Sequence, residues 1–70
     1  MKKTAKKTQR KPRAKLIDAD SNIFNLMGIA SRALKDAGRD DDATEMGNRV
    51  MSSSSFDEAL AIICEYVDPY

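Results

Sequence analysis

Apolar residues recur at three- and four-residue intervals in three stretches of this chain, and this spacing limits the fold more than any other feature. The first stretch predicts a helix at about residues 22–37 that ends at Gly38, and the second a helix at about 41–51 that ends at the serines of residues 52–55. A third stretch follows these serines and stops before Pro69. Such spacing places apolar side chains on one face of each helix. The sequence therefore predicts a mostly α, compact three-helix domain.

Residues that favour helix starts precede each stretch. Residues 20–22 are Asp-Ser-Asn, which are preferred at the N-cap, and residues 40–42 are three aspartates, whose charge suits a helix N-terminus. Ser55 and Glu58 have the spacing of a capping box. We expect Met51 and Phe56 on the apolar faces of the second and third helices.

The chain before the first helix divides into two parts. Residues 1–14 contain almost nothing apolar, so they cannot bury enough surface to offset chain entropy, and we expect a disordered basic tail there. Residues 15–70 form the predicted small helical domain. Residues 14–17 allow one short N-terminal strand, which would pair with a second copy or another protein, or pack as an extended arm. This unpaired segment and the small core together motivate a homodimer as a hypothesis.

Charge is strongly segregated along the sequence. Residues 16–70 carry four basic and eleven acidic residues, although the net charge of the whole chain is only +1. The first fifteen residues contain no acidic residue and eight basic ones: Lys2, Lys3, Lys6, Lys7, Arg10, Lys11, Arg13 and Lys15. Lysine and arginine on such a segment neutralise phosphates without reading sequence. These eight residues are therefore candidates for nucleic-acid binding. An acidic protein, the acidic remainder of this chain, or a purely solubilising role are the alternatives.

A second candidate surface is acidic. Its residues surround the predicted junction between the first two helices and are Asp36, Asp40, Asp41, Asp42 and Glu45. Such a cluster can attract a basic protein or imitate nucleic acid. The alternative is a solvated loop with charges that favour a helix start, which explains the same residues without any partner.

Residue types needed for most catalytic and metal sites are scarce. The chain has no histidine and one cysteine, Cys64, which we interpret as a small buried hydrophobe. Residues 18–22 match the first three ligand spacings of a calcium loop, but Ile23 and Ile29 occupy the positions of its glycine and glutamate. We therefore expect no enzyme activity, no metal and no cofactor. No apolar run approaches the ~20 residues of a membrane span, so we expect no membrane association and a cytoplasmic protein.

Two glycines, Gly28 and Gly47, lie inside predicted helices, where each costs about 1 kcal/mol relative to alanine. We expect them to permit a close approach of two helices. The alternative is that Gly28 forms the floor of a contact site.

One region resembles a family of small uncharacterised proteins from phage and mobile-element genomes. The resemblance rests on residues 20–28, DSNIFNLMG, and 31–38, SRALKDAG, with weaker correspondence at residues 54–57, Leu60 and residues 66–67. Ser21 replaces a glycine of that pattern, and the basic tail is additional. The resemblance implies an accessory protein and carries no mechanism.

These observations predict a non-enzymatic binding module that contacts nucleic acid through its basic tail. The alternative is a protein-interaction factor, such as an inhibitor of a host defence enzyme, that acts through its acidic helical body.

Overall fold

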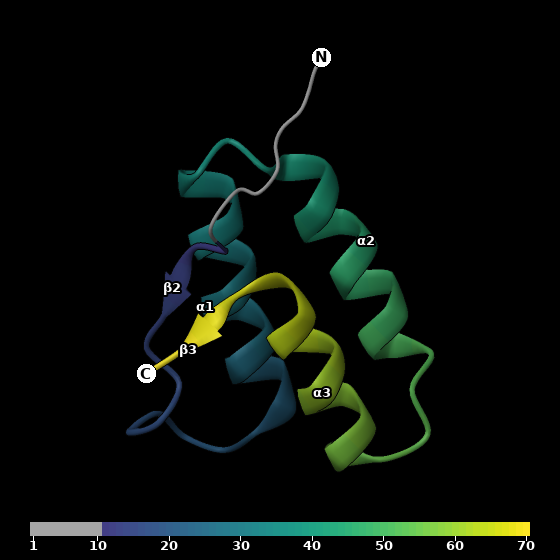
Figure 1. Ribbon diagram of the computed structural model, residues 1–70. Coiled ribbons are helices and arrows are strands. Elements are labelled where there is room, and N and C mark those ends of the chain that lie inside the picture. The colour runs from purple at the N-terminus through teal and green to yellow at the C-terminus, as the bar shows by residue number, and fades with distance from the viewer. Residues whose placement is uncertain (1–10) are drawn as a thin grey trace.

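The computed structural model describes residues 11–70, which form three helices and two short strands (Figure 1). The helices are α1 (Ile23–Asp36), α2 (Asp40–Met51) and α3 (Phe56–Tyr66), and the strands are β2 (Arg13–Ala14) and β3 (Asp68–Pro69). The predicted three-helix domain with one short N-terminal strand is confirmed. The first two helices begin and end within one residue of their predicted bounds.

The junction between α1 and α2 is set by Gly38. This residue has a φ of 77°, in the left-handed region that glycine adopts without strain. Its N–H donates to the Lys35 carbonyl at 3.0 Å, and the Arg39 N–H donates to the Leu34 carbonyl at 2.7 Å. These two bonds satisfy carbonyls that the end of α1 leaves open, which is the Schellman arrangement. The chain reverses here and α2 begins at Asp40.

Side chains cap the starts of α1 and α3. The Asn22 side chain accepts from the Phe24 N–H at 2.9 Å, and the Ser55 hydroxyl accepts from the Glu58 N–H at 3.1 Å. The predicted capping box is only half correct, however. The Glu58 carboxylate accepts from the backbone N–H and the hydroxyl of Ser54, one residue before the expected partner. The start of α3 is therefore held by both Ser54 and Ser55.

The two strands join opposite ends of the described chain. β2 pairs in parallel with β3, and Ala14 lies opposite Pro69. The Asp68 N–H donates to the Pro12 carbonyl at 2.9 Å and the Tyr70 N–H donates to the Ala14 carbonyl at 3.0 Å. Pro69 has no N–H, but the alternate residues on either side of it supply these donors. A proline is therefore tolerated in this strand.

Pairing within the chain corrects two expectations about the N-terminal segment. The Tyr70 carbonyl also accepts from the N–H groups of Leu16 and Ile17, both at 2.9 Å. The segment, for which we considered a second copy, another protein or packing as an extended arm, therefore has a strand partner inside the chain, and the main argument for a homodimer is removed. The expected boundary between residues 14 and 15 is wrong as well, since Ala14 is buried and residues 11–14 pack against the helices. Residues 1–10 of the predicted disordered tail lie outside the described residues.

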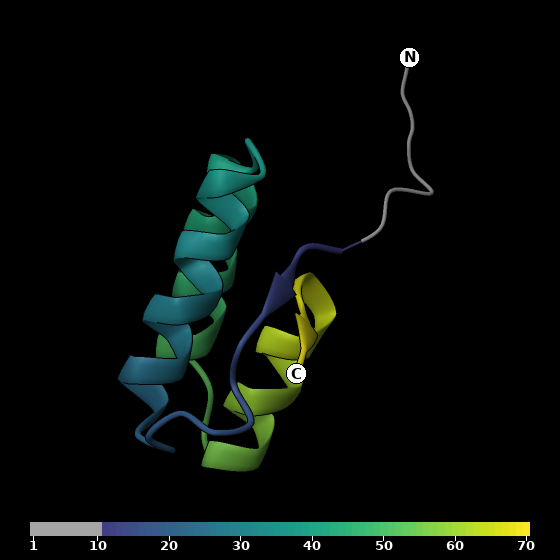
Figure 2. The same cartoon turned by 90° about the vertical axis from the view of Figure 1, so that its left-hand side faces the viewer.

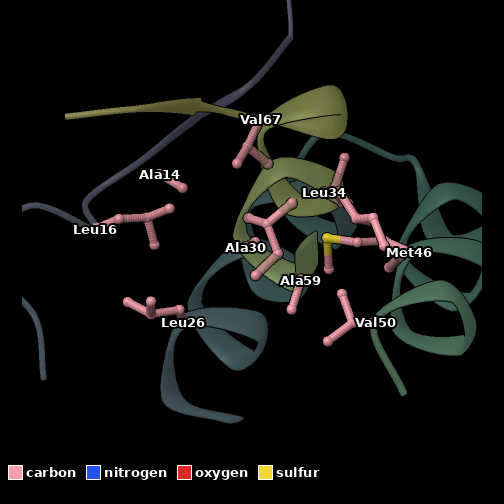
Figure 3. Packing of buried hydrophobic residues seen from close by; sticks show 12 residues of the cluster. Ala14, Leu16, Leu26, Ala30, Leu34, Met46, Val50, Ala59 and Val67 are labelled. Carbon is pink, nitrogen blue, oxygen red and sulfur yellow. The ribbon is translucent and has the colours of Figure 1, made fainter. Parts of the chain in front are cut away.

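The core lies between two layers. Figure 2 shows α1 and α2 on one side and α3 with the two strands on the other. The largest fully buried side chains come from every helix and from the residue that follows α3: Leu34, Met46, Ile63 and Val67. Figure 3 shows Leu34 and Met46 meeting between these layers, while Ala14 and Leu16 close the core on the side of the N-terminal segment.

Gly28 and Gly47 do not serve a close approach of two helices. A Cβ atom built on either glycine meets no atom of another element within 4 Å. The expectation that they let helices approach closely is therefore wrong, because both positions face open space.

No helix within residues 11–70 is long and apolar enough to cross a membrane.

Candidate functional site

The structure divides the eight basic candidate residues into two groups. Five of them lie outside the described residues: Lys2, Lys3, Lys6, Lys7 and Arg10. The other three, Lys11, Arg13 and Lys15, belong to the segment that packs against the helices, and all three are exposed.

Two of these three cations already have partners within the chain. The Lys11 ammonium donates to the Cys64 carbonyl at 2.9 Å, and its nitrogen lies 3.8 Å from a carboxylate oxygen of Asp68. The Arg13 guanidinium lies over the ring of Tyr70, 4.3 Å from its centroid, which is a cation–π contact. Lys11 and Arg13 therefore help to fasten the N-terminal segment to the end of α3 and to β3. They are less available to an external phosphate than the sequence suggested.

The five acidic candidate residues do not form one surface with one role. Asp40, Asp41 and Asp42 occupy the first turn of α2, whose N-cap residue Arg39 supplies no side-chain cap. Negative charge at this position offsets the partial positive charge of the helix N-terminus. Asp42 also lies 3.8 Å from the Arg39 guanidinium. Helix-start electrostatics is thus sufficient to explain these three aspartates.

The other two acidic residues, Asp36 and Glu45, have different surroundings from the three aspartates and from each other. Asp36 is the last residue of α1 and is exposed. Glu45 accepts a hydrogen bond of 2.5 Å from the Tyr66 hydroxyl, so it links α2 to α3. The predicted acidic surface therefore includes one carboxylate that contributes to helix packing.

A polar network that the sequence did not reveal joins α2 to α3. The Arg49 guanidinium donates to both carboxylate oxygens of Glu65, at 2.7 and 3.1 Å, and to the Tyr66 hydroxyl at 3.1 Å. These bonds hold the pKa of Glu65 below its ordinary value and raise the pKa of Arg49. Burial, together with the hydrogen bond to Glu45, raises the pKa of Tyr66. Its centre is a bidentate ion pair between Arg49 of α2 and Glu65 of α3. A role in holding the two helices together is sufficient to explain both charged residues.

Several large apolar side chains remain exposed. Ile17 is 74 % exposed, Phe24 59 %, Met51 63 % and Phe56 44 %. The expectation that Met51 and Phe56 lie on buried helix faces is therefore wrong. Met51 is the last residue of α2 and Phe56 the first of α3, and both line a surface hollow together with Phe24 at the start of α1.

Two of these side chains border a groove of about 400 Å³ between α3 and the extended segment before α1. Ile17 and Ala19 contribute from the extended segment, and Phe56, Leu60 and Cys64 contribute from α3. The spacing of the three α3 residues, four positions apart, places them in one stripe along the helix. Cys64 lies in this stripe among apolar residues but is only half-buried, whereas we expected a buried side chain. Ser21 is the one residue with a polar oxygen in its side chain among the described residues that line the groove.

Within residues 11–70, no three side chains of the types that bind metals gather into a group that could hold an ion. Of the carboxylates in residues 18–22, Asp20 lies at the start of α1, where it accepts from the Asn22 N–H at 3.1 Å.

Comparison with known proteins yields no relative: no protein-family model, no curated protein and no solved structure matches this chain.

Proposed function

We propose that this protein is a non-enzymatic binding module whose N-terminal cations contact nucleic acid without reading its sequence. The observation that carries the proposal is the segregation of charge. Residues 1–10 contain five basic and no acidic residues, whereas residues 11–70 contain seven basic and eleven acidic ones. A segment of one sign attached to a domain of the other sign directs a polyanion to the segment. The acidic domain repels the same polyanion, so it does not compete for it.

The contacts of Lys11 and Arg13 refine the number of cations that remain for phosphate. Lys11 contacts the Cys64 carbonyl and Arg13 contacts the Tyr70 ring. The cations that remain for phosphate contact are the five basic residues of 1–10 and the exposed Lys15. Five or six phosphate contacts correspond to a log–log salt slope of about −4.5 to −5.5 on duplex DNA, whereas eight would give about −7. The slope therefore measures how many of the eight cations act.

The test is fluorescence anisotropy of a labelled duplex, titrated with the full chain over a range of salt concentrations. A variant that carries glutamine at the five basic positions of residues 1–10 should lose most of its affinity. The matched control replaces Arg32 and Lys35, two exposed cations of α1, with glutamine and should bind almost as well as the parent chain. Duplexes of unrelated sequence should bind alike. Undiminished binding by the five-position variant, or a slope close to zero, would contradict the proposal.

The alternative function, a protein-interaction factor such as an inhibitor of a host defence enzyme, was assigned to the acidic cluster. It has less support, because Asp42 pairs with Arg39, Glu45 bonds to Tyr66, and Asp40 and Asp41 suit a helix start. Charge reversal of Asp40 and Asp41 that abolishes capture of a basic protein would favour it. An accessory role in a phage or mobile element is a further proposal, and it rests only on the resemblance of residues 20–38.

A further inference from the structure

The fold brings an aromatic ring to the basic N-terminal segment, whose first fifteen residues contain none. Tyr70 directly follows β3, and the pairing of β3 with β2 places it beside the other end of the described chain (Figure 1). The Arg13 guanidinium lies over the ring, and Tyr70 is 45 % exposed. Tyr70 is therefore held in place by a cation and still reaches solvent.

The cations of the extended segment lie in a row on its outer face. Exposed residues alternate here with the buried residues Ala14 and Leu16. In an extended chain, alternate residues point to the same side. The three exposed residues that precede each buried one or begin the row are all basic: Lys11, Arg13 and Lys15. In sequence, this row directly continues the five basic residues of 1–10.

The strand register places Tyr70 on the same face as this row. Arg13 lies opposite Asp68, and Tyr70 is two residues after Asp68, so both of these side chains lie on the outer side of β3. The contact between the Arg13 guanidinium and the ring agrees with this placement. Asp68 offsets part of the positive charge, since its carboxylate lies 3.8 Å from the Lys11 ammonium. This outer face thus combines three cations, one carboxylate and one aromatic ring.

A row of cations beside an exposed aromatic ring is the combination that binds single-stranded nucleic acids. Lysine and arginine hold the phosphates, and an unpaired base stacks on the ring. In a duplex, each base is already stacked between its neighbours and does not reach such a ring. Stacking favours no particular base, because every base has a π-face. A ring at this place is therefore compatible with contact that does not read sequence.

We propose that the nucleic acid bound by this protein is single-stranded, and that one of its bases stacks on Tyr70. This inference rests on the proposed function and names the form of nucleic acid that the same cations bind. The phosphates beside the stacked base contact Lys15 and the basic residues of 1–10, while Arg13 keeps its place over the ring. A duplex engages the phosphate-binding cations but not the ring.

The test is fluorescence anisotropy with two labelled ligands of equal length, a single-stranded oligothymidylate and a duplex, each titrated with the full chain. Tyr70→Leu should weaken binding of the single strand about tenfold, as loss of one stacked base does, and should leave duplex binding nearly unchanged. The salt slope for the single strand should stay the same, because no phosphate contact is removed. Tyr70→Phe keeps the ring and should bind as the parent chain does. The matched control, Phe24→Leu, removes an exposed ring of α1 and should change neither affinity.

Two further ligands separate the bases from the phosphates and RNA from DNA. An abasic oligonucleotide has the phosphates of the oligothymidylate without its bases. The parent chain should bind it about tenfold more weakly, and Tyr70→Leu should weaken this binding no further. Oligouridylate tests RNA in the same series, and an effect of Tyr70→Leu on either single strand supports the proposal.

A second measurement does not depend on the stability of Tyr70→Leu. The chain contains no tryptophan, so Tyr70→Trp introduces a single indole fluorophore. Its emission should be quenched by oligothymidylate and unaffected by the abasic oligonucleotide. The strand hydrogen bonds use the backbone groups of Tyr70, so this substitution retains them.

The outcomes distinguish this inference from the proposed function. If the parent chain binds neither ligand, the proposed function fails and this inference fails with it. If both ligands bind but Tyr70→Leu weakens neither single strand, or weakens single strand and duplex equally, only the inference is overturned. It is also overturned if Phe24→Leu has the effect of Tyr70→Leu, or if oligothymidylate leaves the emission of Tyr70→Trp unchanged.

Discussion

Replacing the two helical glycines with alanine should stabilise the protein, and the structure allows the effect to be estimated. Gly28 lies inside α1 and Gly47 inside α2, and a Cβ atom at either position meets nothing of another element within 4 Å. Alanine therefore introduces no clash. It restricts the unfolded chain and removes the helix penalty of glycine.

The expected size follows from helix propensity. Each substitution should add about 0.8–1 kcal/mol to the free energy of unfolding, and the two together about 1.5–2 kcal/mol, since the sites lie in different helices. For a domain of this size, the double variant should melt about 6–16 °C higher than the parent chain. The small total stability expected here makes such a change easy to measure.

Thermal and urea unfolding, followed by circular dichroism at 222 nm, provide the assay, and Gly38→Ala is the matched control. Gly38 has a φ of 77°, so alanine there is strained and should lower the free energy of unfolding by about 1–2 kcal/mol. The same substitution, glycine to alanine, is thus expected to stabilise the protein at two positions and to destabilise it at the third. Destabilisation by Gly28→Ala or Gly47→Ala would refute the reasoning, because it would show that a neighbour occupies the space beside that glycine.

Further predictions concern the core and the titrating side chains. Leu34→Ala should destabilise by about 2–5 kcal/mol, enough to unfold most of the protein, whereas Ile17→Ala should change little, and urea titration distinguishes these outcomes. The pKa of Glu65 is lowered in the folded state by Arg49, so its stabilising contribution is present above the unfolded pKa and is lost as the pH falls through the folded pKa. Glu65→Gln should therefore flatten the acid limb of a stability–pH profile, and an unchanged limb would contradict this. The pKa of Tyr66 is raised, so stability should fall as the pH rises above about 10, and Tyr66→Phe should remove that fall.

The helices could be predicted because their signals are local. Asn22 caps α1, Gly38 ends it, and Ser55 caps α3, and each of these residues acts on its near neighbours in the chain. The periodic apolar residues between these points then face the core, as Leu34 and Ile63 do. Local capping and periodicity together fix a helix without knowledge of the rest of the fold.

The strand pair could not be predicted because its signal is neither local nor periodic. β2 and β3 contain two residues each and lie at opposite ends of the described chain. A two-residue strand is too short to show an alternation of apolar and polar side chains. Pro69 by itself argues against a strand, because only the pairing register shows that its missing N–H is not needed. The exposure of Met51 and Phe56 was missed for a related reason, since periodicity within a helix does not show what packs against its terminal residues.

The candidate sites were predicted unevenly. Charge segregation is visible in the sequence, but the engagement of Lys11 by Cys64 and Asp68 depends on how α3 and β3 return to the N-terminal segment. The groove was not predictable, because its walls meet only after folding.

The hydrogen bonds that β3 gives to β2 have a consequence for the order of folding. During synthesis, residues 12–17 emerge before all three helices, yet their backbone partners at residues 68–70 are made only after α3. The helices can associate earlier through contacts that are closer in sequence, so we expect the strand pair to close last. A substitution that weakens this closure, such as removal of the Tyr70 ring that Arg13 covers, should accelerate unfolding while leaving the folding rate nearly unchanged.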